Sequence, residues 1–390
     1  MTLMTGRNGR PAVRNLCSTA VAAGLLLTAG GGTAAQECGA AGRWWAPETP
    51  DRLLRTDEVV SHIREADVVL LGERHDLKDH HRWQLHTLGA LQGQPGLKAV
   101  GFEMFNRPHQ PALDQWIEGE MGERDLLRQT EWHATWGFPP ALYTPLFHFT
   151  RLHRMPTVAL NVERGLVRRI REEGWANVPE DERYGIGDPA PATEGYEERL
   201  AGVYAGHPET ENGLEGFMRA QLFWDRAMAE GLADAAERFG TPVAGIVGRG
   251  HAMYGYGIPH QLNDLGIENV VVLLPWDVEN GCAADETPPP ADFLFGMVSY
   301  EERPEDPPLL GIFLEESDEG VTISDVMEES VAEEAGLAIG DVVLTAAGRT
   351  IDSIPDLQAT VRRQPSGTWL PLEIRRDGES MEIVARFPAR

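Results

Sequence analysis

The sequence predicts an α/β fold, with a mostly parallel sheet flanked by helices on both faces, followed by a small β-rich C-terminal domain. Between residues 50 and 280, short apolar runs alternate with amphipathic segments of helical period. Continuous apolar runs are typical of strands that are buried on both faces of a parallel sheet. From Leu309 onward the pattern changes to short alternating strands with one clear helix. The length of 390 residues agrees with two domains.

The first 35 residues have the composition of a cleavable secretory signal peptide. Three arginines precede an apolar stretch from Cys17 to Ala29, and small residues follow it. This stretch is shorter than the roughly 20 residues that a membrane-spanning helix needs. Neither Cys17 nor Cys38 is preceded by the small-residue lipobox of a lipoprotein. We therefore expect a periplasmic or secreted protein that carries no lipid anchor.

Removal of that segment leaves two cysteines, Cys38 and Cys282. In an oxidising compartment such a pair predicts a disulfide, although two free thiols are the alternative. The formal net charge of the chain is −27. Such an acidic surface repels nucleic acid and anionic membranes, so we expect no nucleic-acid partner. The acidity is also compatible with a saline habitat, which the sequence leaves open.

Five apolar runs are expected to form the sheet of a domain at residues 36–283. They are DVVLLG (67–72), AVGFEMF (99–105), TVALNV (157–162), PVAGIVG (242–248) and NVVVLLP (269–275). The clearest helix between them runs from Leu214 to Phe239, where apolar side chains form one stripe. The segment from Asn177 to Gly213 lacks periodicity and is expected to be a surface insertion or a lid.

Ionisable side chains follow several of these runs. Gly72-Glu73-Arg74-His75 and Gly248-Arg249-Gly250-His251 both place a histidine three residues after a glycine that ends a run, and Glu103 lies near the end of the second run. Because the carboxyl ends of parallel strands meet at one edge of a sheet, we expect these groups to lie together. The alternative is that both histidines are ordinary loop residues.

This set of side chains is compatible with more than one chemistry. Two imidazoles and one or two carboxylates can hold a divalent transition metal that keeps a position open for water. The same groups can act without a metal, with a glutamate polarising a histidine that serves as a general base. Candidate catalytic residues are Glu73, His75, Glu103 and His251, and the candidate metal ligands are His75, Glu103 and His251.

Two tyrosines, Tyr254 and Tyr256, follow His251 in the glycine-rich loop AMYGYGIPH. A tyrosinate is a known axial ligand of ferric haem. Each tyrosine taken alone is also compatible with ordinary packing of the loop.

Four segments resemble the ChaN family of haem-binding uptake proteins, within the Tiki superfamily. They are VVLLGERHD, GFEMF, AQLFWDRAMAEGL and GIVGRGHAMYGYGIP, and the resemblance extends over about residues 50 to 280. It implies an α/β fold, export in bacteria, and haem binding linked to haem or iron acquisition, in a homodimer that shares the cofactor. The haem-binding candidates are then His75, His251, Tyr254 and Tyr256. Known members can be lipoproteins, and the missing lipobox departs from that pattern.

The resemblance also implies an alternative function. Related branches of the superfamily are metal-dependent peptidases and erythromycin-type esterases, in which the matching histidines and glutamate are catalytic. His75, Glu103 and His251 match those residues, so the alternative is a hydrolase that acts with or without a metal. Whether the chain is an enzyme stays open at this point.

Proline- and acid-rich stretches predict a linker at residues 284–308, before a second domain at residues 309–390. The order of LLGIFLEE, an Ala-Gly-Leu turn, GDVVL, an Ala-Gly hairpin and the helix IPDLQATVRRQ resembles a PDZ domain of the bacterial protease-associated type. The resemblance implies binding of a peptide carboxyl terminus, and thereby of an envelope partner protein. The alternative is that the protein's own linker occupies the groove.

A PDZ domain binds such a peptide as an added β-strand. The added strand would lie beside Ile312 to Leu314. The expected peptide-binding residues are Leu310, Gly311 and Ile312, through backbone N–H groups that hold the carboxylate, and Leu357 and Val361, which line the pocket for the last side chain.

Overall fold

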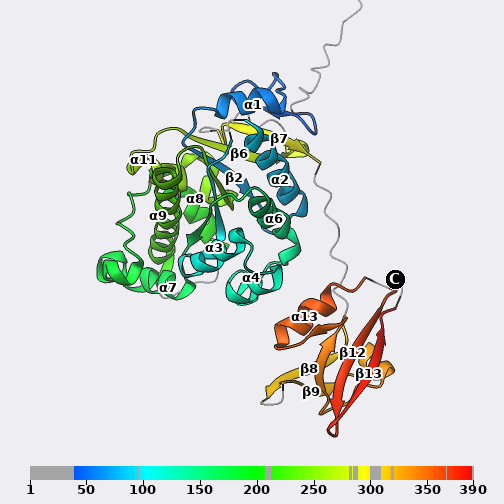
Figure 1. Cartoon of the computed structure of the whole chain (residues 1–390). Helices are drawn as coiled ribbons and strands as arrows, with labels where there is room; N and C mark the ends of the chain where they lie inside the picture. The colour runs from blue at the N-terminus through cyan, green and yellow to red at the C-terminus, as the bar shows by residue number, and fades with distance from the viewer. Residues whose placement is uncertain are drawn as a thin grey trace, which may run out of the picture. The chain divides into compact units, whose positions relative to one another are not determined.

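The computed structural model describes residues 39–94, 96–206, 212–280, 283, 289–298, 309–317, 320–365 and 367–388. These residues form a seven-stranded sheet and, later in the chain, a six-stranded sheet (Figure 1). The predicted fold class is thereby confirmed. The expected signal peptide and both partners of the expected disulfide, Cys38 and Cys282, lie outside the described residues.

The first sheet has the strand order β1-β7-β6-β2-β5-β3-β4. Its strands are β1 (Trp44–Trp45), β2 (Val68–Glu73), β3 (Ala99–Asn106), β4 (Thr157–Asn161), β5 (Val243–Gly248), β6 (Val270–Asp277) and β7 (Phe293–Met297). All five predicted apolar runs form strands, and neighbouring pairs among them are parallel. Strands β2 and β5 are buried at every position because they lie in the middle of the sheet.

The sheet also extends beyond its predicted range. Strand β7 falls inside the segment that we expected to be linker, but it pairs with β6 in parallel. The two-residue strand β1 pairs with β7 in antiparallel orientation, as Trp44 faces Phe295 and Trp45 faces Leu294. The expectation of a linker over the whole of residues 284–308 is therefore wrong for Phe293–Met297, whose apolar side chains complete the sheet.

Helices cover both faces of the first sheet, as Figure 1 shows for α2 and α6 on one side and α9 and α11 on the other. The helices are α1 (Thr56–Ile63), α2 (Lys78–Gly93), α3 (Gln110–Glu118), α4 (Glu123–Gln129), α5 (Trp132–Thr135), α6 (Thr144–Leu152), α7 (Arg164–Glu173), α8 (Glu194–Tyr204), α9 (Gly213–Phe239), α10 (Arg249–Ala252) and α11 (Ile258–Asp264). Val69 and Leu71 of β2 pack in the core with α1, α2 and α6. Val68 and Leu70 pack in the core with α9 and α11. Because successive side chains of a strand point to opposite faces of the sheet, β2 contributes to two hydrophobic cores.

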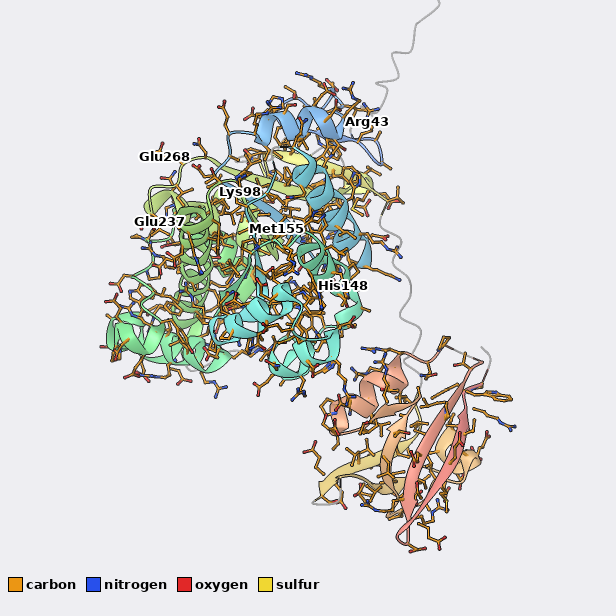
Figure 2. The ribbon with its side chains drawn as sticks, in the orientation of Figure 1. Arg43, Lys98, His148, Met155, Glu237 and Glu268 are labelled. Carbon is orange, nitrogen blue, oxygen red and sulfur yellow. The ribbon has the colours of Figure 1, made fainter. Side chains whose placement is uncertain are left out.

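Some acidic side chains of this domain lie on its outer surface. Figure 2 shows Glu237 and Glu268 at its periphery, and both are exposed. Met155 is buried in the core. Among the described helices, none combines the length and the apolar character needed to cross a membrane.

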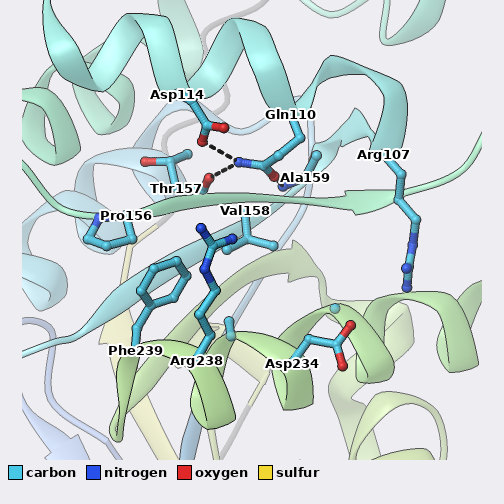
Figure 3. Close-up of a pocket in the computed structure, with 12 residues that line it drawn as sticks. Arg107, Gln110, Asp114, Pro156, Thr157, Val158, Ala159, Asp234, Arg238 and Phe239 are labelled. Carbon is cyan, nitrogen blue, oxygen red and sulfur yellow. Dashed lines mark hydrogen bonds between the residues drawn. The ribbon is translucent and has the colours of Figure 1, made fainter.

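Strand β4 is an edge strand whose outward backbone groups are bonded by a side chain. The Gln110 amide donates to the Thr157 carbonyl (2.8 Å) and accepts from the Ala159 N–H (2.9 Å). Figure 3 shows this arrangement at one wall of a surface hollow, with Asp114 as a further partner of Gln110. The amide therefore occupies backbone sites that would otherwise be open to pairing with another strand.

We expect Gln110→Ala to lower the free energy of unfolding by about 1–3 kcal/mol, because two edge-strand groups lose their partners. Urea denaturation of the variant and the wild type measures the difference. Gln115→Ala on the exposed face of the same helix is the control and should change stability by less than about 0.5 kcal/mol. Equal stability of both variants would contradict the role assigned to Gln110.

The second sheet is antiparallel, with the order β13-β12-β10-β9-β8 and β11 paired to β10. Its elements are β8 (Ile312–Ser317), β9 (Gly320–Val326), α12 (Val331–Ala335), β10 (Val342–Ala346), β11 (Arg349–Thr350), α13 (Ile354–Arg362), β12 (Trp369–Arg376) and β13 (Glu379–Arg386). Helix α13 contributes Leu357 and Val361 to the core of this domain. Strand β8 is an edge strand, paired with β9 alone among the described strands.

Candidate functional site

Three residues that the sequence analysis singled out lie together at the carboxyl edge of the first sheet. Nε2 of His75 is 4.0 Å and Nε2 of His251 is 3.7 Å from the same oxygen, Oε1 of Glu103. The three residues come from β3 and from the segments that follow β2 and β5. Because β5 pairs with both β2 and β3, their ends are adjacent. We call His75, Glu103, His251 and the residues around them the rim.

His75 is oriented by a buried carboxylate. Glu73, the last residue of β2, is 1% exposed, and its Oε1 lies 2.6 Å from Nδ1 of His75. The Tyr143 hydroxyl donates to the His75 carbonyl at 3.3 Å and reaches the same glutamate oxygen at 3.5 Å. The sequence analysis missed Tyr143, which lies just before α6 and far from Glu73 in the chain.

The protonation of the Glu73–His75 pair follows from this burial. Burial raises the pKa of Glu73 to about 7. Burial opposes the charged form of His75, but the hydrogen bond to Glu73 and the charge of Glu103 outweigh it and raise the pKa of that imidazole. Since both pKa values are raised, the pair holds a proton near neutral pH. Such a pair can take up or release a proton on the rim side of the imidazole.

Glu103 is fixed by the turn after β5. Its Oε2 accepts a short hydrogen bond from the backbone N–H of Gly248. A Cβ at Gly248 would lie 2.8 Å from Cε1 of His75, which is too close for a side chain. The glycine therefore lets β5 approach both the carboxylate and the imidazole.

His251 has its own buried carboxylate, Asp225 of α9. Nδ1 of His251 lies 2.6 Å from Oδ1 of Asp225, and the Tyr196 hydroxyl donates to the other oxygen at 2.6 Å. Burial acts against the charged imidazole, but the charge and hydrogen bond of Asp225 outweigh it and raise the pKa of His251 to about 9. The sequence analysis missed Asp225 and Tyr196. The sequence did contain a signal for Asp225, because this acidic residue lies among apolar neighbours in the segment LFWDRAM.

Aromatic side chains surround the two imidazoles. The rings of Trp136 and Phe138 lie 4.7 and 5.3 Å from the ring of His75, measured between centroids. The indole of Trp224 lies 6.3 Å from the ring of His251. The rim therefore combines ionisable groups with an apolar wall, as is usual for small-molecule sites.

The two tyrosines after His251 have different surroundings. Tyr254 is half-buried, has a φ of 61°, and lies with its ring 4.8 Å from the guanidinium carbon of Arg199. The hydroxyl of Tyr256 packs so closely on Gly195 that a Cβ at that position would lie 2.4 Å from it. Arg199 and Tyr196 belong to α8. Part of the segment expected to be a surface insertion thus contributes directly to the site.

A family model described as "Haem-binding uptake, Tiki superfamily, ChaN" matches residues 59–262. The chain belongs to the ChaN family. A second model, for the PDZ domain, matches residues 308–385. The resemblances stated from the sequence are thereby confirmed. The ChaN domain contains the rim, and the PDZ domain contains the second sheet.

The chain is also similar to several individual proteins. The chain is similar to ChaN of Campylobacter jejuni, solved with cofacially bound haem, at 19% identity and a TM-score of 0.49, with 65% of this chain and 95% of that chain covered. It is also similar to a probable periplasmic serine protease, do/HhoA-like, of Haemophilus influenzae, 31% identical over 71 residues. Serine protease HTRA1 of Xenopus tropicalis is 35% identical over 68 residues.

The matches to the two proteases cover 18% and 17% of this chain. The chain spans only 15% and 14% of the length of these two relatives.

The ChaN rim does not form an evident metal centre. Among the described residues, no group of three or more histidine, cysteine, aspartate or glutamate side chains is arranged to hold a metal ion. The sequence analysis gave His75, Glu103 and His251 as candidate metal ligands and left catalysis without a metal as the alternative. The structure instead commits both Nδ1 atoms to buried carboxylates, which leaves the Nε2 atoms facing Glu103.

The raised pKa of His251 in the ChaN domain gives a pH prediction. A folded-state pKa of about 9, above the usual value near 6.5, means that protonation of His251 stabilises the fold below about pH 6.5. This stabilisation, on the order of 3 kcal/mol, is lost as the pH rises through about 9. NMR titration of the histidine ring protons measures the pKa, and His251→Gln identifies the signal.

In Asp225→Asn the pKa of His251 should fall, because only the charge of Glu103 then opposes the effect of burial. A His251 signal that titrates near pH 6.5 in the wild type would contradict the proposed pairing.

Proposed function

We propose that this chain is an exported haem-binding protein that acts in haem or iron acquisition, and that its PDZ domain binds the carboxyl terminus of a partner protein. The position of Tyr254 is the main observation that supports haem binding. It lies on the rim of a ChaN domain beside Arg199, and its charged form would also lie near Arg249. The composition of residues 1–35 supports export.

Tyr254 is the better candidate for the axial haem ligand. A phenolate is an anionic oxygen donor that ferric haem accepts, and the guanidinium group of Arg199 lies over the ring of Tyr254. The hydroxyl of Tyr256 is enclosed against Gly195 instead. The φ of Tyr254 lies in the left-handed region, which costs a non-glycine residue roughly 1–2 kcal/mol and is often found at functional sites.

Titration with hemin tests this proposal. Hemin added to the purified chain without residues 1–35 should shift the Soret band until one haem is bound per chain. Sedimentation of the same samples tests the further proposal that two chains share bound haem, which predicts a dimer in the loaded state. Absence of any Soret shift would overturn the haem-binding function.

The geometry at the start of β8 supports peptide binding by the PDZ domain. The Leu310 carbonyl accepts from the Ala332 N–H, and the Gly311 carbonyl accepts from the Met327 N–H. In a trans peptide the N–H points opposite to the carbonyl of the preceding residue. The N–H groups of Gly311 and Ile312 therefore point away from these partners and can meet a carboxylate.

The proposed pocket residues have a more enclosed position than the sequence suggested. Leu357 and Val361 are 1% and 8% exposed and belong to the core of this domain, and Ile312 and Leu314 pack against that core. A terminal apolar side chain would therefore reach them only between α13 and the edge strand β8.

A fluorescent peptide that ends in an apolar residue tests this binding mode. We expect anisotropy to report binding of the free acid and at least ~10-fold weaker binding of the same peptide with an amidated end, because the carboxylate contacts are lost. Equal binding of both forms would contradict a carboxylate site at Gly311 and Ile312.

The rim geometry also favours a second candidate function. Both imidazoles are held by buried carboxylates and direct Nε2 toward Glu103. Such an arrangement suits general acid–base catalysis by a hydrolase. Hydrolysis of a panel of esters and peptides should then occur in the wild type and disappear in His75→Ala and in His251→Ala. Activity that persists in both variants would remove this function.

A further inference from the structure

Three arginines gather beside the two histidines of the rim. Arg74 follows β2, Arg249 begins α10 directly after β5, and Arg199 belongs to α8. The loops that carry the first two meet closely, since a Cβ at Gly72 would lie 3.1 Å from Cα of Arg249. Burial lowers the pKa of Arg249, and the charges of Arg74 and Arg199 lower it further, whereas those of Tyr254 and Asp76 oppose this change. The charges of Arg74 and Arg199 thus both act on Arg249.

Two of these cations form no ion pair with another described residue. Within the described residues, no carboxylate forms an ion pair with Arg199 or Arg249, whereas Arg226 of α9 is paired with both Glu230 and Asp264. The contacts of Arg199 are the ring of Tyr254 and the sulfur of Met253. The chain has 61 acidic residues against 34 basic ones. In such a protein, two unpaired guanidinium groups at a ligand site indicate that the ligand supplies the negative charge.

We propose that Arg199 and Arg249 bind the two carboxylate groups of the haem and thereby orient it on the rim. This inference rests on the proposed haem binding and names the chemistry that would position the ligand. A guanidinium group matches a carboxylate with two parallel hydrogen bonds and keeps its charge at any working pH. Arg199 lies over the ring of Tyr254. Its guanidinium group would therefore contact both a carboxylate at the porphyrin edge and the tyrosine that holds the iron.

Hemin and hemin dimethyl ester separate this inference from haem binding itself. The two compounds share the iron and the ring, but the ester lacks both carboxylate charges. Soret titrations of the full chain without residues 1–35 give a dissociation constant for each compound. We expect Arg199→Gln and Arg249→Gln each to weaken hemin binding at least ~10-fold, and to change ester binding less than ~3-fold.

Two further variants sharpen the comparison. Arg199→Lys keeps the positive charge and should retain most of the preference for hemin over the ester. Arg238→Gln is the matched control, because Arg238 also stacks on an aromatic ring, that of Phe239. It lies at the end of α9, just before β5 begins, whereas the rim lies where β5 ends. It should bind both compounds like the wild type.

The outcomes are distinct for each claim. Equal losses for hemin and the ester in Arg199→Gln and Arg249→Gln, or no loss for either, would overturn the carboxylate site while leaving haem binding intact. Failure of the wild type to bind both compounds would overturn the haem-binding function together with this inference. Thermal unfolding of each variant confirms that the folded protein is being compared.

Discussion

Replacement of Tyr254 by phenylalanine is expected to abolish the Soret shift of added hemin, or to raise the dissociation constant on the order of 100-fold, equivalent to about 2.7 kcal/mol. The variant removes only the hydroxyl oxygen and keeps the ring beside Arg199. Since the oxygen is the proposed iron ligand, the loss should fall on binding and not on stability. Absorption titration and thermal unfolding of the same samples separate the two effects.

The matched control is Tyr256→Phe, two residues further along the same loop. The hydroxyl of Tyr256 faces Gly195, so the variant should bind hemin like the wild type. A lost Soret shift in Tyr256→Phe together with normal binding by Tyr254→Phe would reverse the assignment of the two tyrosines.

The second large effect is expected for Asp225→Ala, which should lower the free energy of unfolding by about 3–5 kcal/mol near neutral pH. The carboxylate is fully buried and is bonded to both His251 and Tyr196. Its removal leaves the partly buried imidazole of His251 and the buried hydroxyl of Tyr196 without this partner. Denaturant unfolding at constant pH measures the loss.

Two comparisons test the cause of that destabilisation. Glu237→Ala removes a carboxylate from the exposed surface of the same helix, labelled in Figure 2, and should change stability by less than about 0.5 kcal/mol. Asp225→Asn keeps a hydrogen-bond acceptor without the charge and should fall between these two variants. If Asp225→Ala were as stable as Glu237→Ala, the His251–Asp225–Tyr196 chain would have no structural role.

The central strands and the core of the rim could be predicted because their signals are local. Each apolar run is long enough to identify a buried strand, and parallel pairing then brings the ends of β2, β3 and β5 to one edge. His75, Glu103 and His251 needed no further information to be placed together. By contrast, β1 has only two residues, and β7 follows a proline-rich stretch. Neither has a periodic pattern that reveals pairing.

The partners of the histidines could not be predicted, because they depend on how helices cross the sheet. Helical periodicity identified α9 but gave no reason to connect Asp225 with His251, 26 residues later. Tyr196 and Arg199 lie in a segment whose composition indicated only an insertion. Their role follows from the packing of α8 against α9 and the Tyr254 loop, which is set by tertiary structure.

A crystal structure of the hemin-loaded chain is the most direct test of the claim that the rim is a haem site. We expect iron bonded to the Tyr254 hydroxyl oxygen, with the haem carboxylates at Arg199 and Arg249. Haem bound away from the carboxyl edge of the first sheet, or iron held there without Tyr254, would contradict it.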